Sequence, residues 1–417
     1  MEIFMGLVGI VVLLAIALAL STNRSAINLR TVGGAFAIQL ALGAFVLYVP
    51  FGQQVLEAIS NLVQSVIDSA QAGMDFVFAG LVSDKMFELF GGGGFIFAFR
   101  VLPVIIFFSA FMAVLYYLGI MQWVIKIFGG ALEKMLGTSR AESLSATANI
   151  FVGQTEAPLV VRPFVAKMTQ SELFAVMVGG LASVAGSILA ALAGIGVEIK
   201  YLIAASFMAA PGGLLMAKIM VPETGKPIEN LTDAEAGGDQ AKPINVIDAA
   251  ATGASSGLQL ALNVGAMLLA FIGLIALLNN LVGWTGGLVG YQDITIELIL
   301  GYIFSPLAFV MGVPAGEVIQ AGSLIGQKMV LNEFVAYFSF VDIREGLSGQ
   351  TQVIMTFALC GFANFSSIAI LLGGLGTIAP SRRPDIAKFG IRAVIAGSLS
   401  NFMSATLAGL FMALGAS

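Results

Sequence analysis

The chain has 417 residues, of which 58% are hydrophobic and only 10% are charged, and its mean hydropathy is +0.98. This composition excludes a set of soluble domains and predicts an all-α polytopic membrane protein in a lipid bilayer. The small net charge of −5 does not imply nucleic acid as a partner, and the absence of histidine excludes His-ligated metals and histidine-based catalysis.

Apolar runs long enough to cross a bilayer recur from the first residues onward. The initial run carries Glu2 in place of a basic segment and shows no cleavage site, so we expect a retained span and not a signal peptide. Residues 54–70 place apolar side chains at helical spacing, which indicates an amphipathic helix on the membrane surface or a packing helix outside the bilayer. Eight spans are expected, at roughly 3–20, 33–50, 95–119, 172–197, 199–220, 255–282, 351–376 and 387–414.

Two further apolar regions, 139–165 and 314–340, each contain a polar break near the middle. Their arms are too short to cross a bilayer alone, so we interpret both regions as re-entrant helical hairpins. Ser139 and Glu142 have the spacing of a capping box at the start of the first hairpin, and Pro314 is expected to open the second.

Basic residues support this topology. If the N-terminus lies outside and each hairpin returns to the side from which it enters, most of the 19 Lys and Arg residues fall on the inner side, as the positive-inside rule requires. Both termini are then outside. The segment 221–248 is rich in Pro, Gly, Asn and acidic residues, which predicts a mobile loop between the two halves.

The two halves repeat the same order of elements in opposite orientation. We expect scaffold spans and the surface helix at 1–120, a first repeat at 121–220 (interfacial helix, hairpin 139–165, broken span 172–197, span 199–220), a scaffold span at 249–285, and a second repeat at 286–417 (interfacial helix, hairpin 314–340, broken span 351–376, span 387–414). Inverted repeats with broken helices build the midplane site of secondary transporters.

Each hairpin carries a glutamate at its tip, Glu156 in GQTE and Glu333 in VLNE. A carboxylate in hydrocarbon costs ~2.5–3.5 kcal/mol even on lenient insertion scales, so both carboxylates need water, a cation or ligand donors. The polar residues expected to gather there offer many acceptors without a basic partner, which suits a neutral polar solute: they are Gln154, Thr155, Glu156, Glu333, Asn364 and Ser367. The first arm ends at Asn149–Val152, whose carbonyls, with Ser183, are hard oxygen ligands for Na⁺.

Three motifs in this order, VGQTEAPLVVRP at 152–163, NEFVAY at 332–337 and GFANFSSIAILLGGLG at 361–376, resemble the sodium-coupled bacterial branch of the concentrative nucleoside transporter family. The resemblance covers essentially the whole chain. It implies a homotrimer with a static scaffold, a mobile transport domain that holds both hairpins, and an elevator-like alternating-access cycle.

The resemblance also implies roles for individual residues. The nucleobase would be bound by Gln154, Thr155, Glu156, Ile188, Leu260 and Phe362. The ribose would be bound by Glu333, Asn364 and Ser367, and the co-transported sodium ion by Asn149, Val152, Ser183 and Val184.

The sequence thus predicts a multi-pass sodium–nucleoside symporter of the bacterial inner membrane, with uridine as a representative substrate. Two alternatives stay open, a proton-coupled nucleoside transporter and an ion-coupled carrier of another neutral polar solute. An enzyme is not expected, because no histidine and no evident nucleophile–base pair are present.

Overall fold

The structure is a computed structural model that describes residues 2–90, 94–228, 243–288, 290 and 294–415. Within these ranges the chain is helical and contains no strand, so the all-α prediction is confirmed. Half of the mobile loop predicted at 221–248, residues 229–242, lies outside the described ranges.

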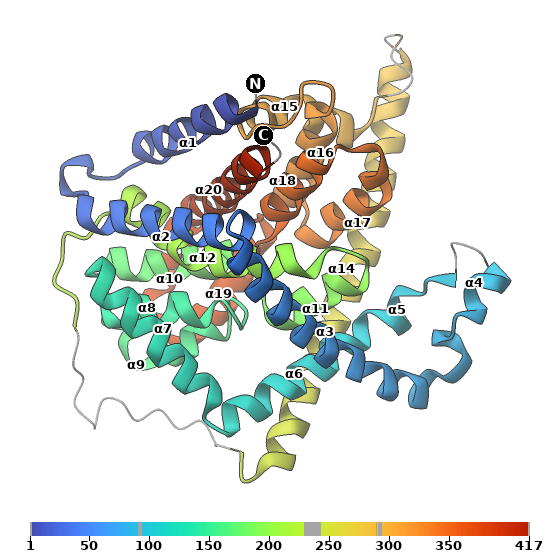
Figure 1. Cartoon of the computed structure of the whole chain (residues 1–417), viewed down its shortest axis with the longest axis horizontal. Helices are drawn as coiled ribbons and strands as arrows, with labels where there is room; N and C mark the ends of the chain where they lie inside the picture. Colours follow the sequence, from blue (N-terminus) through green and yellow to red (C-terminus); the bar gives the residue numbers. More distant parts are fainter. Residues whose placement is uncertain (1, 91–93, 229–242, 289, 291–293, 416–417) are drawn as a thin grey trace.

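Helices follow one another along the whole described chain (Figure 1). The first half forms α1 (Glu2–Ala19), α2 (Leu29–Leu47), α3 (Pro50–Phe78), α4 (Lys85–Phe90), α5 (Phe97–Arg100), α6 (Leu102–Tyr117), α7 (Ile120–Leu136), α8 (Arg140–Ala148), α9 (Arg162–Val165), α10 (Gln170–Ala182), α11 (Gly186–Gly194) and α12 (Ile199–Met220). The second half forms α14 (Val246–Leu288), α15 (Ile296–Val310), α16 (Val318–Val330), α17 (Glu333–Ile343), α18 (Gly349–Leu359), α19 (Ser366–Ile378) and α20 (Arg383–Gly415). Single 3-10 turns are η1 (Arg24–Ala26), η2 (Ala79–Val82), η4 (Ala157–Val161), η5 (Arg344–Gly346) and η6 (Pro380–Arg382).

Several helical stretches are long and apolar enough to cross a membrane. Among the described residues these are Leu29–Leu47, Phe97–Tyr117, Gln170–Gly194, Ile199–Met220, Val246–Leu288 and Pro380–Gly415, and α1 is a shorter apolar helix. A multi-pass membrane protein therefore follows from the structure as well as from the sequence.

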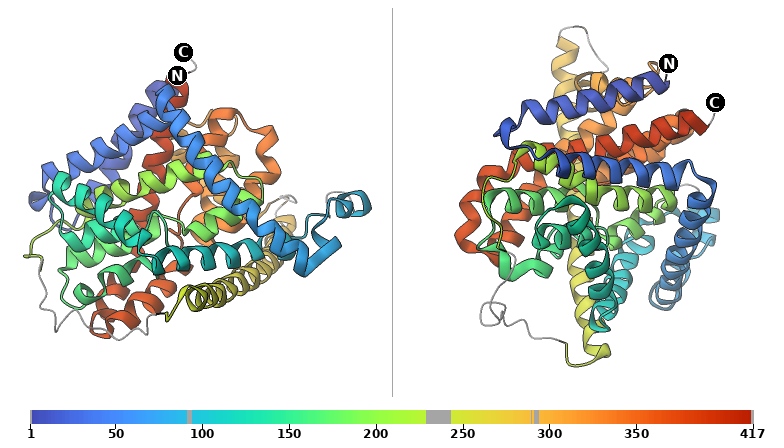
Figure 2. Two further views of the ribbon diagram at one scale, coloured as in Figure 1. Left: turned by 60° about the horizontal axis from the view of Figure 1, so that its bottom comes forward. Right: turned by 60° about the vertical axis from the view of Figure 1, so that its left-hand side comes forward.

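These helices form an inner bundle and an outer layer. The apolar windows of the α10–α11 stretch, of α12 and of the η6–α20 stretch are 94% buried inside the chain, whereas that of α14 is 11% buried. The long α14 packs along α6 at one side of the molecule, and α1 lies beside α20 (Figure 2). The exposed faces of the outer helices must be covered by lipid or by other protein.

The predicted surface helix at 54–70 is longer in the structure, where α3 runs over Pro50–Phe78. Pro50 stands at the first helical position, where its missing N–H costs nothing. The helix ends before Ala79, whose φ of 47° lies in the left-handed region. One face of α3 packs against α2, α6 and α12, while the other is exposed.

The two hairpins open in different ways. The capping box predicted for the first is confirmed, since Ser139 and Glu142 exchange both backbone–side-chain hydrogen bonds at the start of α8. The second does not open at Pro314 as predicted. The Pro314 carbonyl accepts a hydrogen bond from Glu317 N at 2.9 Å to close a turn, and α16 begins only at Val318.

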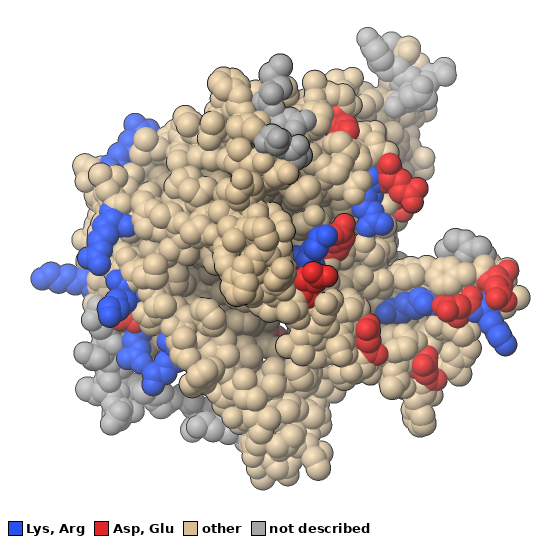
Figure 3. All heavy atoms as spheres, viewed as in Figure 1, with Lys and Arg blue, Asp and Glu red and all other residues tan. Residues whose placement is uncertain are grey.

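Charged side chains are distributed unevenly over the face shown in Figure 3. Basic side chains gather along its left edge, acidic and basic ones lie together at its right, and the surface between them is nearly uncharged. A broad uncharged surface between two charged edges is what a bilayer-embedded protein requires.

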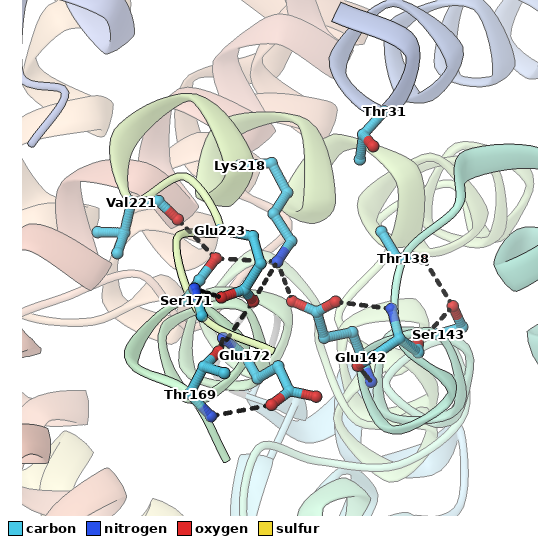
Figure 4. A network of polar contacts seen from close by, with 12 residues as sticks. Thr31, Thr138, Glu142, Ser143, Thr169, Ser171, Glu172, Lys218, Val221 and Glu223 are labelled. Atoms are coloured by element: carbon cyan, nitrogen blue, oxygen red, sulfur yellow. Dashed lines mark hydrogen bonds and ion pairs between the residues drawn. The ribbon is translucent and has the colours of Figure 1, made fainter. Parts of the chain in front are cut away.

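A buried charged network fixes the start of the first hairpin to the inner bundle (Figure 4). Lys218, near the end of α12, forms an ion pair with Glu142 of α8 and lies 3.6 Å from Glu223. Its Nζ also donates to Ser171 Oγ of α10 at 2.9 Å. Because Lys218 and Glu142 are only 6% and 2% exposed, loss of Lys218 leaves the Glu142 charge buried without an ion-pair partner, whereas loss of Glu142 leaves Lys218 paired with Glu223.

Candidate substrate and cation site

Each hairpin tip packs into the break of the neighbouring span in its own repeat. In the first repeat, Gly186 N donates to Phe151 O at 3.0 Å, so the tip lies against the gap between α10 and α11. In the second, Phe365 N donates to Met329 O at 3.1 Å, across the gap between α18 and α19. The irregular backbone of both breaks is thereby buried in protein, as membrane depth requires.

The two breaks also meet one another. Phe362 N in the second break donates to Ser183 O in the first at 3.1 Å. Gln154 Nε2 at the first tip donates to Ser367 Oγ of α19 at 3.3 Å. Residues more than 200 positions apart in the chain are therefore in contact at the centre of the inner bundle.

A cavity of about 500 Å³ opens where the tips and breaks converge. It is lined by Gly153, Gln154, Thr155, Glu156, Ala185, Ile188, Ser256, Gln259, Leu260, Asn263, Val264, Ala266, Met267, Leu268, Asn332, Glu333, Phe334, Phe362, Asn364, Ser366, Ser367 and Ile370. This set includes every residue that the family resemblance assigned to the nucleobase or to the ribose. A cavity of this size with a few convergent polar groups is the usual form of a small-molecule site.

The polar groups of the second repeat are held in place by hydrogen bonds. Asn364 Nδ2 donates to Glu333 Oε2 at 3.0 Å, and Asn364 Oδ1 accepts from Ser367 N at 2.9 Å. Glu333 is 5% exposed and Asn364 is 1% exposed. Asn364 therefore orients the Glu333 carboxylate, and it uses its own oxygen to begin α19.

The groups of the first repeat are less constrained. Gln154 is buried, and its Oε1 accepts no hydrogen bond from any described residue. Thr155 and Glu156 are exposed, and the Glu156 carboxylate accepts a hydrogen bond from Gly153 N at 3.3 Å. This side of the cavity offers free acceptors to a ligand with N–H or O–H groups.

The lining of the cavity contains two glutamates and no lysine or arginine among the described residues. Such a site disfavours an anion, for which basic partners are needed. It suits a neutral solute with hydroxyl and amide-like donors, and Phe362, Ile188 and Leu260 supply apolar surface for a ring.

Five polar residues of the cavity were not identified from the sequence. Two of them, Asn332 and Ser366, directly precede the predicted Glu333 and Ser367. Ser256, Gln259 and Asn263 lie on α14, the span that was interpreted only as scaffold apart from Leu260. Their spacing places them on one face of an otherwise apolar helix, and this polar stripe is the signal that would have indicated them.

The residues predicted to bind sodium lie on two segments that touch. A Cβ built on Gly180 of α10 would lie 3.7 Å from Asn149 Oδ1, and Ser183 ends α10 beside it. Asn149, Val152, Ser183 and Val184 are all buried, with at most 5% exposure. Asn149 Oδ1 accepts no hydrogen bond from any residue that the structure describes. An unpaired buried amide oxygen is costly, and a cation would satisfy it.

Models of known protein families match most of the chain. Residues 8–81 match "Na+ dependent nucleoside transporter N-terminus", residues 98–198 match "Nucleoside recognition", and residues 201–409 match "Na+ dependent nucleoside transporter C-terminus".

Individual proteins agree with these matches. The chain is 58% identical to an uncharacterized transporter of Haemophilus influenzae over 100% of this chain and 99% of that one. It is 50% identical to the nucleoside permease NupC of Helicobacter pylori over 98% of each. Among solved structures, CNTnw in an inward-facing substrate-bound state matches with a TM-score of 0.95 and 61% identity over 100% of both chains.

Proposed function

Because the chain belongs to the Na⁺ dependent nucleoside transporter family, we propose that it imports nucleosides in symport with sodium by an elevator-like alternating-access mechanism. As a member of this family it is a multi-pass membrane transporter and not an enzyme. The geometry of the cavity and of the two breaks supports the proposed site, coupling ion and mechanism.

The convergence of both hairpin tips on one cavity is the observation that carries the proposal. Glu333 comes from the tip of the second hairpin and Gln154 from the first, and both line the same cavity. Glu333, Asn364 and Ser367 would receive the ribose, since a carboxylate can accept hydrogen bonds from two neighbouring hydroxyls. Gln154, Thr155 and Glu156 would meet the polar edge of the base, and its faces would pack on Ile188, Leu260 and Phe362.

Sodium is proposed as the coupling ion because the first break offers hard oxygen ligands and needs no titrating group. Asn149 Oδ1, with the Ser183 hydroxyl and the Val152 and Val184 carbonyls as further ligands, would hold the ion. Gln154 lies on the hairpin tip that would share the ion. Phe362 lies in the second break, and its N–H donates to Ser183 O of the first break, which would also hold the ion. Binding of sodium would therefore order the same groups that bind the nucleoside.

An elevator-like movement is supported by the position of the cavity between two layers. Its outer wall belongs to α14, which packs chiefly along α6, and its inner wall belongs to the hairpins and broken spans. Movement of the inner bundle past α14 would expose the cavity on alternate sides. We further propose a homotrimer assembled through exposed scaffold helices in the bacterial inner membrane, with both termini outside. The basic edge in Figure 3 would then lie on the inner side of the membrane.

The central test is uridine uptake into proteoliposomes by Glu333→Gln. The substitution removes the charge but keeps the size of the side chain, and we expect uptake to fall at least about tenfold because hydrogen bonds to a charged acceptor are lost. The matched control is Glu345→Gln, on the exposed turn that follows the same hairpin. Equal uptake by both variants would remove Glu333 from the substrate site.

Imposed gradients distinguish the coupling ions. Uptake driven by a sodium gradient at equal pH is expected, whereas a pH gradient without sodium should drive none. Uptake under the pH gradient alone would instead favour the proton-coupled alternative. Competition of labelled uridine by unlabelled nucleosides, sugars and amino acids tests whether the substrate is another neutral polar solute.

A further inference from the structure

A lysine is fully buried near the tip of the second hairpin. Lys328 stands in the last turn of α16 and has 0% exposure. Its Nζ donates to Ala358 O in the last turn of α18 at 2.8 Å and to Asn401 Oδ1 of α20 at 2.7 Å. It also lies 5.7 Å from the centre of the Phe402 ring. No carboxylate forms an ion pair with it in the described part of the chain, although it interacts electrostatically with Glu333.

Asn401 connects this ammonium to both broken spans. While its Oδ1 accepts from Lys328, its Nδ2 donates to Ala182 O at 2.6 Å and to Cys360 O at 2.8 Å. Ala182 is the last residue of α10, and Cys360 directly follows α18. One side chain of α20 therefore binds the carbonyl ends of the broken spans in both repeats.

The position of Lys328 has a counterpart in the first repeat. There the C-terminal end of the hairpin arm α8, at Asn149, lies against the C-terminal part of α10. In the second repeat the C-terminal end of α16 lies against the C-terminal end of α18, with the Lys328 ammonium between them. Helix C-termini carry partial negative charge, so each of these meeting points attracts a cation.

The two repeats meet this requirement differently. The first has an unpaired Asn149 oxygen and no lysine or arginine bonded to it among the described residues. The second has a lysine whose ammonium already bonds the carbonyl and amide oxygens. We propose that Lys328 is a tethered cation that takes in the second repeat the place that the coupling sodium takes in the first. This inference rests on the proposed sodium site.

The tethered cation acts as a positioning residue for nucleoside binding. By holding the end of α18, Lys328 fixes the break in which Phe362 and Asn364 face the cavity, and Asn364 in turn orients Glu333. The second repeat would then stay ordered without a bound ion, and only the first repeat would respond to sodium.

Two substitutions of Lys328 distinguish the loss of its charge alone from the loss of its charge together with its side-chain volume. Lys328→Met removes the charge and keeps the volume, and uridine binding measured by calorimetry should weaken about 10- to 100-fold at saturating sodium.

Lys328→Ala removes the charge and leaves room beside Ala358 O and Asn401 Oδ1. Added methylammonium, or additional sodium, should then restore its uridine affinity at constant ionic strength, and its sodium dependence should be steeper than that of the wild type. Lys328→Met should not respond.

The matched control is Lys388→Met, which removes an exposed lysine of α20, the helix that carries Asn401, without touching either break or either hairpin. It should leave both the uridine affinity and the sodium concentration that gives half-maximal uridine binding unchanged.

The outcomes separate this inference from the proposed function. If the wild type binds uridine with normal sodium dependence and Lys328→Ala shows neither weakened affinity nor recovery with any added cation, the tethered cation is refuted and the sodium site stands. The tethered cation is also refuted if Lys328→Met binds uridine like Lys388→Met. A wild type that binds uridine equally with and without sodium would refute the sodium proposal. It would also refute the inference that Lys328 takes the place of that sodium in the second repeat.

Discussion

Asn401 offers the most quantitative test of how the two repeats are held together. Replacing Asn401 with alanine removes three hydrogen bonds at once, those to Lys328, Ala182 and Cys360. All of these groups are nearly inaccessible, since Asn401 is 3% exposed and Lys328 is 0% exposed. Water therefore cannot replace the lost partner without opening the bundle.

The expected cost follows from the groups left unpaired. Two carbonyls lose a donor, each at about 1–3 kcal/mol, and the ammonium keeps Ala358 O as its remaining partner. We expect a total of about 2–6 kcal/mol, which for a chain of this length lowers the midpoint of thermal unfolding by roughly 2–7 °C. The midpoint can be followed in detergent by size-exclusion chromatography of heated samples.

A control lies on the same helix. Ser398 is 2% exposed, and its Oγ has no hydrogen-bond partner among the described residues. Ser398→Ala therefore removes no described interaction and should leave the midpoint within about 1 °C of the wild type. If Asn401→Ala and Ser398→Ala unfold at the same temperature, Asn401 does not hold the two repeats together.

Two further substitutions test the cavity and the cation site. Asn149→Ala removes the unpaired amide oxygen and should raise the sodium concentration for half-maximal uridine uptake at least about tenfold, and an unchanged value would exclude Asn149 as a ligand. Gly180→Ala places a Cβ 2.8 Å from Gln154 Cβ and should weaken uridine binding roughly tenfold by displacing that side chain. Gly373→Ala, whose Cβ meets nothing within 4 Å, should bind as the wild type does, and equal affinities for the two glycine variants would contradict the role of Gln154.

The sequence predicts the membrane fold and the polar groups that the hairpin tips and breaks bring to the cavity because the relevant signals are local. Glu156 and Glu333 interrupt apolar runs, and an ionisable group at membrane depth is rare enough to stand out. The small polar residues of both breaks, such as Ser183 and Asn364, follow in matching order downstream. Assigning Ile188 and Leu260 to the cavity depended on the family resemblance, since apolar residues in membrane helices carry no signal of their own.

The partners of the two buried lysines could not be predicted from the sequence, because they lie far away along the chain. Lys328 binds Asn401, 73 positions away, and Lys218 binds Ser171, 47 positions away. The positive-inside rule merely assigned both lysines to sides of the membrane, although each lies inside the protein with 0% and 6% exposure. Only the packing of α16 and α12 against distant helices shows that these cations have internal partners.

The two-layered wall of the cavity has a consequence for pharmacology. Under the proposed function, groups of the inner bundle would bind the nucleoside, and the bound nucleoside would have to pass the face of α14 that borders the cavity during transport. In the proposed elevator-like movement, an analogue that keeps its hydroxyls but bears a bulky substituent toward Gln259 would bind and then block the movement by contact with α14. Tight binders from such a series would be inhibitors and not cargo, so screens that rank compounds by affinity alone would select the wrong molecules for delivery.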